Sequence, residues 1–444
     1  MKKEEKKLYE DVRYELEDLK KAMLVGSYND QQDRETCLEN LEELASLSAT
    51  YGFEVVNKSP CPIRKIDAGT FFGSGKLEEL KKIADECQAD VIIIDEDISP
   101  NQQRNLEKIF EKPLIDRTEL ILEVFAKRAH TKEARLQIEL AKTEYQLPRL
   151  KRLWTHLSRQ AGTAGGGASG GGGYLKGEGE TQIEIDRRIL KKRISVLHEQ
   201  LKTIRETRHT QRQGRLRSGV PLFGIVGYTN AGKSTLLNTL TNAGVLAEDK
   251  LFATLDTTTR KFTLPNHQEI LLIDTVGFIR KLPHGLVEAF KSTLEEVVYT
   301  DILLHVIDVS HPMAEKHAEA TYEVLKELGA DRKPIITILN KADMCAHKGA
   351  IMKFKLKYPK TVVLSALHKQ GLEQLYEMII KEVKNLRTLM TLKIPQSRYE
   401  LVSELMKKGH VVESSYEEND VLIKVEVPKE MEHKVLSYVI PESD

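Results

Sequence analysis

Apolar and polar positions divide the 444-residue chain into four blocks of different character. In residues 21–114, short apolar runs alternate with apolar positions at helical spacing. Strands are predicted at 22–25, 53–56 and 91–94, and helices at 33–50, 76–87 and 101–110. The third strand is apolar throughout, as in a parallel strand that is buried on both faces. We therefore expect an N-terminal α/β domain at residues 1–116.

The second block, residues 117–218, has the pattern of two long helices. Apolar residues step by three and four within 136–157 and again within 190–204. These stretches are predicted to pair as an antiparallel hairpin, with Pro148 bending the first helix. Between them lies the glycine-rich stretch 161–179, where glycine's freedom disfavours both helix and strand. The block is thus expected to be a helical hairpin with a flexible tip.

The third and fourth blocks return to mixed α and β patterns. Residues 219–388 predict a mostly parallel sheet, with strands at 221–226, 270–273, 302–307, 335–339 and 361–364 and helical segments between them. Residues 389–444 predict a small α+β domain, with helices at 396–407 and 429–439 and a strand at 421–427. The fold class is therefore a multidomain α/β protein.

Charge is balanced overall but unevenly distributed. Lys plus Arg and Asp plus Glu number 67 each, so the net charge excludes no class of partner. Residues 127–217, however, hold 21 basic and 9 acidic residues, an excess of twelve positive charges. Alternating signs would suffice for a solvated helix face, so this one-sided excess favours a polyanion such as RNA.

Cysteine spacing and hydropathy exclude several other classes. The four cysteines show neither zinc-ligand spacing nor a disulfide framework. The N-terminus has no signal-peptide pattern, and no apolar run approaches the length needed to span a bilayer. We expect a cytoplasmic protein with no stable membrane insertion.

Residues 227–234 carry the pattern G-x-x-x-x-G-K-[ST] between a predicted strand and a predicted helix. In such a loop the backbone N–H groups surround a β-phosphate and the helix N-terminus adds partial positive charge. Lys233 would neutralise β- and γ-oxygens, and the Ser234 hydroxyl would ligate Mg²⁺. The candidate phosphate-binding residues are Gly227, Tyr228, Thr229, Asn230, Ala231, Gly232, Lys233, Ser234 and Thr235.

Three further motifs follow predicted strands in the same block. Residues 274–277 offer a carboxylate for a magnesium-bound water and a glycine N–H for a γ-phosphate. In residues 340–343 the Asp343 carboxylate can accept from guanine N1–H and N2–H₂, which adenine lacks, while Lys341 packs over the ring. Residues 365–367 can give guanine O6 a backbone N–H. The candidates are Asp274, Thr275, Val276, Gly277, Asn340, Lys341, Ala342, Asp343, Ser365, Ala366 and Leu367.

The loop between the first two motifs contains several threonines that could bind Mg²⁺ and respond to a γ-phosphate. Spacing does not choose among Thr254, Thr257, Thr258 and Thr259. The residue after Gly277 is Phe278, where Ras-like proteins place the glutamine that orients water. Hydrolysis of GTP to GDP is therefore expected to be slow until a partner stimulates it, and no catalytic side chain is assigned.

A second glycine-lysine motif, residues 73–76, lies at a predicted loop-to-helix junction in the N-terminal domain. It lacks the second half of a P-loop. A helix-capping turn is favoured there over a second nucleotide site.

These motifs, with the sequence from Gly177 to Arg188 that ends the glycine-rich stretch, resemble the HflX family of translational GTPases over nearly the whole chain. The resemblance implies the same domain order and a monomer. It also implies that Thr254 is the magnesium-binding threonine, in a nucleotide-binding loop with Phe252, Ala253, Leu255 and Asp256. Thr257 stands where the family often has proline.

The resemblance further implies a partner, the large ribosomal subunit with its ribosomal RNA, and an activity, the splitting or rescue of stalled or idle ribosomes. The alternative is a ribosome-assembly or RNA-remodelling factor that uses GTP as a binding switch without splitting. A metabolic P-loop enzyme is disfavoured by the guanine motif.

Overall fold

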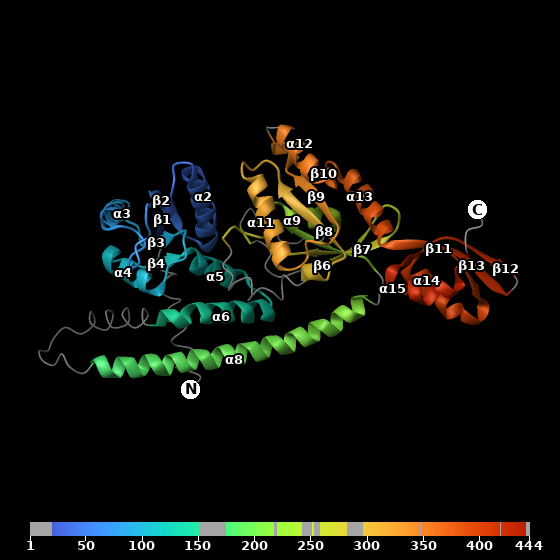
Figure 1. The fold of residues 1–444 in the computed structure, drawn as a ribbon, viewed down its shortest axis with the longest axis horizontal. Helices are drawn as coiled ribbons and strands as arrows, with labels where there is room; N and C mark the ends of the chain where they lie inside the picture. The colour runs from blue at the N-terminus through green and yellow to red at the C-terminus, as the bar shows by residue number, and fades with distance from the viewer. Residues whose placement is uncertain are drawn as a thin grey trace, which may run out of the picture. The chain divides into compact units, whose positions relative to one another are not determined.

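The computed structural model describes residues 20–150, 175–216, 220–241, 251–252, 258–281, 296–345, 348–417 and 419–440 (Figure 1). These residues cluster into two compact units. The first contains the described residues up to Lys202 together with Leu251 and Phe252, and the second contains the remainder. The long helix α8 (Leu175–Leu216) begins in the first unit and ends in the second.

Four parallel strands form the sheet of the first unit, in the order β2-β1-β3-β4. The strands are β1 (Lys21–Tyr28), β2 (Glu54–Pro62), β3 (Val91–Ile94) and β4 (Leu114–Asp116). The helices are α2 (Asp33–Tyr51), α3 (Ser74–Glu86), α4 (Pro100–Phe110) and α5 (Arg117–Arg128). β3 is buried along its whole length, which explains its continuous apolar sequence. The strands and helices predicted for this block are present with boundary shifts, and β4 and α5 are additions.

The glycine-lysine motif of this domain forms the start of α3. The helix begins at Ser74 directly after Gly73, and Lys76 Nζ lies 2.8 Å from a carboxylate oxygen of Glu79 one turn along. The lysine thus pairs within its own helix, as in the helix-capping reading.

The predicted helical pair consists of α6 (Lys132–Gln146) and α8. Pro148 falls in a single 3₁₀ turn, Leu147–Arg149, that ends α6. The two helices are joined by Arg193 Nε, which donates to Glu139 Oε1 at 2.7 Å. Among the heptad positions of α8, Leu190, Leu197 and Leu201 are buried, as their spacing predicts.

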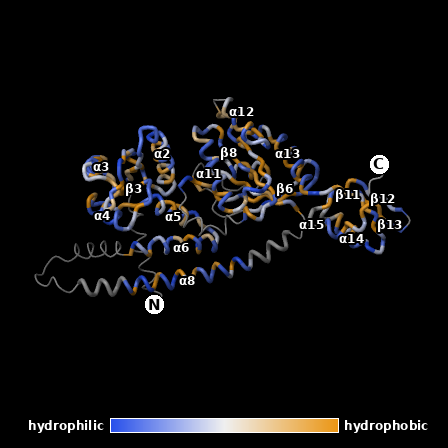
Figure 2. The backbone as a smooth tube through the Cα atoms, viewed as in Figure 1, coloured by the Kyte–Doolittle hydropathy of each residue, from blue (hydrophilic) through white to orange (hydrophobic). Residues whose placement is uncertain are grey.

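The expected extent of the glycine-rich loop, 161–179, is wrong at its end because α8 already begins at Leu175. Single glycines such as Gly177 and Gly179 each cost a helix about 1 kcal/mol, and a long helix that is already nucleated can extend through them. Residues 151–174 lie outside the described ranges. α8 has 42 residues, and the part of it that is coloured in Figure 2 mixes hydrophilic and hydrophobic positions. No helix in the described ranges is long and apolar enough to cross a bilayer.

Six strands form the sheet of the second unit, in the order β10-β9-β8-β5-β7-β6, with β6 alone antiparallel to its neighbour. They are β5 (Leu222–Gly227), β6 (Thr258–Thr263), β7 (Glu269–Asp274), β8 (Ile302–Asp308), β9 (Ile335–Asn340) and β10 (Thr361–Val363). The helices are α9 (Lys233–Thr241), α11 (Ala314–Glu327), α12 (Lys348–Lys357) and α13 (Leu372–Asn385).

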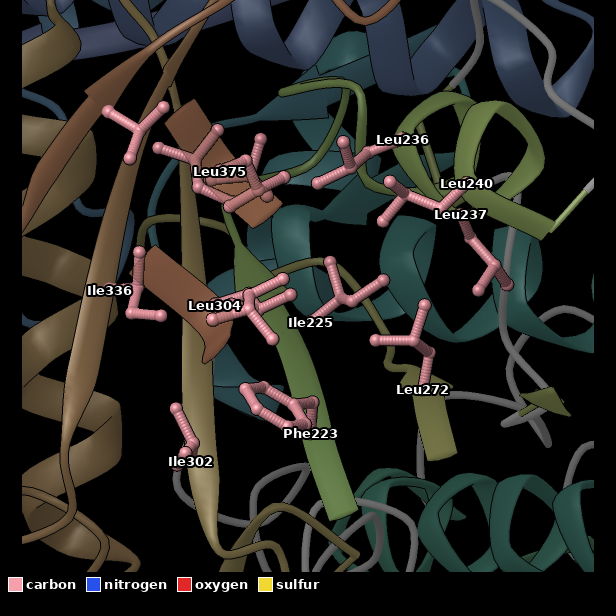
Figure 3. Close-up of a cluster of buried hydrophobic side chains, with 14 of the residues drawn as sticks. Phe223, Ile225, Leu236, Leu237, Leu240, Leu272, Ile302, Leu304, Ile336 and Leu375 are labelled. Atoms are coloured by element: carbon pink, nitrogen blue, oxygen red, sulfur yellow. The ribbon is translucent and has the colours of Figure 1, made fainter. Parts of the chain in front are cut away.

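Apolar side chains from this sheet and its helices form a core cluster (Figure 3). Phe223 and Ile225 of β5 lie in it with Leu304 of β8, and Leu236 and Leu240 of α9 join from the helix after the phosphate loop. The core therefore fixes both elements that flank that loop.

One polar side chain, His305, lies fully buried in the middle of β8. Its ring meets Tyr322 edge-on, with centroids 5.0 Å apart, and within the described residues neither ring nitrogen has a hydrogen-bond partner. Burial, with Lys233 adding repulsion, lowers the pKa of His305 to about 3. The imidazole is therefore neutral at ordinary pH.

The C-terminal segment forms an antiparallel sheet, β11-β13-β12, with a core of its own. The strands are β11 (Arg387–Pro395), β12 (His410–Glu417) and β13 (Asp420–Pro428), with helices α14 (Tyr399–Lys408) and α15 (Lys429–Val435). The predicted helices and the strand at 421–427 are present, each with small boundary shifts. β11 and β12 were not predicted, and β11 starts at Arg387, before the expected domain boundary.

Candidate nucleotide-binding site

The phosphate loop follows β5 and leads into α9, as its sequence predicts. Gly227 has φ 149° and Gly232 has φ 94°, in the region that favours glycine. A Cβ on Gly227 would lie 2.2 Å from the Val306 carbonyl oxygen, and one on Gly232 would lie 2.2 Å from Asn340 Nδ2. Neither position can carry a side chain. The loop therefore packs against two neighbouring strands, and α9 begins at Lys233, where the N–H groups of a helix N-terminus can bind an anion.

Lys233 and Ser234 are the first two residues of α9, directly after the phosphate loop. Lys233 is buried, and its Nζ donates to the Tyr228 carbonyl at 2.6 Å. Burial lowers the pKa of Lys233 to about 8, while the Asp274 carboxylate opposes that shift. The Ser234 hydroxyl donates to Asp274 Oδ2 at 2.8 Å. A hydroxyl and a carboxylate in contact form the kind of oxygen donor set that Mg²⁺ prefers.

The segment after Asp274 is tied to the phosphate loop by backbone hydrogen bonds. Phe278 N donates to the Gly227 carbonyl at 3.1 Å, and Thr229 N donates to the Phe278 carbonyl at 2.7 Å. Thr275, Val276 and Phe278 are buried, and the Thr275 hydroxyl donates to the Ile225 carbonyl. The Phe278 side chain therefore packs in the interior and offers no group to orient water.

Tyr228, the residue after Gly227, adds two side-chain contacts to these backbone hydrogen bonds. Its hydroxyl accepts from Arg280 N at 2.7 Å, and its ring stacks on His317 of α11 with centroids 3.8 Å apart and planes 4° apart. Burial, followed by repulsion from His311, lowers the pKa of His317 to about 3, so the ring is neutral. Sequence reasoning missed His317 because no motif links α11 to the phosphate loop.

The base-recognition motif is organised by Asn340. Its Nδ2 donates to the Ala231 carbonyl at 2.9 Å and its Oδ1 accepts from Ala366 N at 3.0 Å. This single amide joins the phosphate loop to the 365–367 segment. The Ser365 N–H also has a partner, the Gln370 carbonyl. Ser365 N and Ala366 N therefore both have partners within the fold.

Asp343 is held as a carboxylate. A hydrogen bond from the Ser365 side chain is the first cause that lowers the pKa of Asp343 below its usual range, and His368 and Lys341 add attraction. Lys341 Nζ lies 2.7 Å from Asp308 Oδ2, and Ala342 N donates to the Leu364 carbonyl. An ionised Asp343 suits the two N–H donors of guanine.

The loop expected to respond to a γ-phosphate is described only in part. Phe252 is buried with φ 56°, and its ring meets Phe125 edge-on at 4.4 Å between centroids, both residues belonging to the first unit. Ala253, Thr254, Leu255, Asp256 and Thr257 lie outside the described ranges. Thr258 and Thr259 begin β6 and pair with Asp274 and Ile273.

Three family models match consecutive stretches of the chain. They are described as a GTP-binding GTPase N-terminal region, residues 38–126, a GTP-binding GTPase middle region, residues 128–215, and a 50S ribosome-binding GTPase, residues 222–341. The GTPase HflX of Chlamydia pneumoniae is 46% identical over 96% of this chain and 90% of that protein. The chain belongs to the HflX family. It is therefore a GTPase that binds guanine nucleotides.

A second HflX protein shows the same similarity. GTPase HflX of Escherichia coli strain K12 is 39% identical over 91% of this chain and 92% of that protein. A GTP-binding protein from Sulfolobus solfataricus, solved in complex with GDP, is 27% identical over 82% of this chain and 98% of its own, with a TM-score of 0.43. The HflX resemblance drawn from the motifs is confirmed.

Proposed function

We propose that this HflX-family GTPase binds GTP with Mg²⁺, acts on the large ribosomal subunit through its basic helical hairpin, and separates the subunits of stalled or idle ribosomes. The observation that carries the ribosomal part is an exposed basic cluster on α8. The matched family description of residues 222–341, a 50S ribosome-binding GTPase, supports the same partner.

The magnesium part of the proposal is supported by the contact between Ser234 and Asp274. Ser234 Oγ would ligate the ion directly, and the Asp274 carboxylate would hold one of its waters. Thr254 is proposed as the second protein ligand. When bound, Mg²⁺ neutralises charge on the β- and γ-phosphates. Asp274 meanwhile holds the Ser234 hydroxyl through their hydrogen bond.

The identity of Phe278 explains why a partner is needed. Its side chain is apolar and buried, so the chain itself does not place a water-orienting group after Gly277. A ribosomal component that orders this segment or adds a catalytic group would raise the rate. GTP turnover should therefore be slow alone and rise with purified large subunits, whereas equal turnover with and without subunits would count against the proposal.

The basic cluster consists of Arg187, Arg188, Lys191 and Lys192, all of which are exposed. Arg193, next in sequence, is held by Glu139 instead and is left out of the cluster. Four exposed cations within six positions of one helix suit a polyphosphate backbone, since each neutralised phosphate releases counterions. Ribosome binding should therefore weaken steeply as salt rises.

A pair of matched variants tests the cluster. Arg188→Glu with Lys192→Glu reverses two exposed charges four residues apart on α8. Lys381→Glu with Lys384→Glu reverses two exposed charges on α13 and serves as the control. Sedimentation with large subunits at several salt concentrations should show weaker binding and a salt slope lower by about one per lost phosphate contact in the α8 variant. Nucleotide affinity should be the same in both, and equal ribosome binding by the two variants would contradict the assignment.

Light scattering separates splitting from the alternative role in ribosome assembly. Adding the GTP-bound protein to intact ribosomes should lower the scattering as subunits separate. Deletion of residues 165–173, which lie outside the described ranges, is expected to spare most affinity but impair splitting. Full splitting by the deletion variant would show the tip to be a connector, and no splitting by the unmodified protein would favour the assembly role.

A further inference from the structure

The backbone segment after Gly277 is held against the phosphate loop in two different ways. Phe278 N donates to the backbone carbonyl of Gly227 at 3.1 Å. Arg280 N, two residues further on, donates instead to the side-chain hydroxyl of Tyr228 at 2.7 Å. The first bond needs no side chain, whereas the second needs a hydroxyl at one point in space. The placement of the Tyr228 ring therefore decides whether the second bond forms.

His317 of α11 supports the Tyr228 ring from one side. The two rings are parallel within 4°, and their centroids are 3.8 Å apart. Tyr228 is buried, and burial lowers the pKa of His317, so the contact is a stack of two uncharged rings. The tyrosine hydroxyl lies at the end of its side chain, where a small rotation around χ1 produces the largest displacement. A flat ring packed against the tyrosine limits that displacement.

His317 is itself fixed by the start of α11. Its N–H donates to the Met313 carbonyl at 2.9 Å, and Met313 N donates to His311 Nδ1 at 3.1 Å. The loop that leads into the helix is tied to the end of β9, because Val309 N donates to the Asn340 carbonyl at 3.1 Å. The His317 ring is therefore held by the sheet and its own helix, independently of the segment after Gly277.

We propose that His317 is a positioning residue for GTP hydrolysis, which holds the Tyr228 ring so that the tyrosine hydroxyl keeps the segment after Gly277 in place during the reaction. The inference rests on the proposed nucleotide site and is independent of the ribosome. Because Phe278 orients no water, hydrolysis by the chain alone depends on how well its backbone orders the reacting groups. GDP lacks the γ-phosphate that Gly277 meets in the proposed site, so His317 acts on hydrolysis and leaves GDP binding unchanged.

Three substitutions on α11 test this role. His317→Ala removes the ring and His317→Phe keeps a flat one, whereas the control, Tyr322→Ala, removes a ring of the same helix that packs on His305 and Tyr358. Single-turnover GTP hydrolysis without ribosomes and the dissociation constant for GDP are measured on the full chain with Mg²⁺. His317→Ala should slow hydrolysis roughly five- to tenfold at saturating GTP and leave GDP affinity within about twofold. His317→Phe and Tyr322→Ala should hydrolyse GTP within about twofold of the unmodified protein.

A double substitution separates positioning from a general structural effect. Tyr228→Phe removes the hydroxyl and keeps the ring, so adding His317→Ala to it should slow hydrolysis by less than about twofold more if His317 acts through that hydroxyl. Equal slowing by His317→Ala in the two backgrounds would overturn the inference, as would equal slowing by His317→Ala and Tyr322→Ala. An unchanged rate in His317→Ala would overturn it as well. Failure of the unmodified protein to bind GDP would instead refute the nucleotide site itself.

Discussion

Replacement of Asn340 by alanine would break the link between the two ends of the nucleotide site. Asn340 is 3% exposed, and its amide satisfies the Ala231 carbonyl and the Ala366 N–H. Alanine leaves both backbone groups buried without a partner, at about 1–3 kcal/mol each. The free energy of unfolding should fall by roughly 2–6 kcal/mol, and at about 2–4 °C per kcal/mol the Tm should fall by roughly 4–24 °C.

Scanning calorimetry with and without GDP measures this effect. Asn340→Asp should fall between alanine and asparagine, because its carboxylate still accepts from Ala366 N but cannot donate to the Ala231 carbonyl. Asn266→Ala is the control: Asn266 accepts a hydrogen bond of 3.2 Å from Gln268 N in the turn that precedes β7. The reasoning would be refuted if Asn340→Ala lowered the Tm no more than Asn266→Ala does and left the GDP affinity unchanged.

Three further changes probe separate parts of the site. GDP affinity should fall roughly tenfold between pH 7 and pH 9, because Lys233, with a pKa of about 8, loses its charge as pH rises. A GDP affinity that does not change over this pH range would contradict the prediction. Tyr228→Phe keeps the ring stack on His317 but removes the hydroxyl that accepts from Arg280 N. Single-turnover hydrolysis should slow about fivefold, and GDP affinity should stay unchanged. An unaltered rate would exclude a positioning role for Tyr228. Asp343→Asn should weaken GTP binding and admit xanthosine triphosphate, and identical preferences in both proteins would rule out guanine readout by Asp343.

The sequence predicts those parts of the site that follow from local pattern. Glycines at 227 and 232 indicate the phosphate loop, because the backbone there has positive φ and a Cβ atom would clash with neighbouring atoms. Asp274 and Asn340 end strands whose apolar sequences mark them as buried. Parallel strands bring those ends to one edge of a sheet, so the motifs were expected to meet.

Two kinds of feature could not be predicted from the sequence: contacts between segments that are far apart in the chain, and strands that lack a clear apolar pattern. His317 stacks on Tyr228 from a helix with no motif of its own. β12 is a sheet-edge strand with mostly exposed side chains, so its sequence lacks the alternation that marks a half-buried strand. The Asn340 amide is used within the fold, to join two loops, and a motif match does not reveal that use.

His305 shows that the core of the second unit is not optimised for stability at every position. A neutral ring with two unpaired nitrogens occupies the middle of a central strand where an aliphatic side chain would leave no polar atom unsatisfied. Natural selection removes variants whose stability is too low for function, but it does not maximise the stability of the variants that remain. For an engineer, that position is a place where a volume-matched apolar substitution is expected to raise heat resistance.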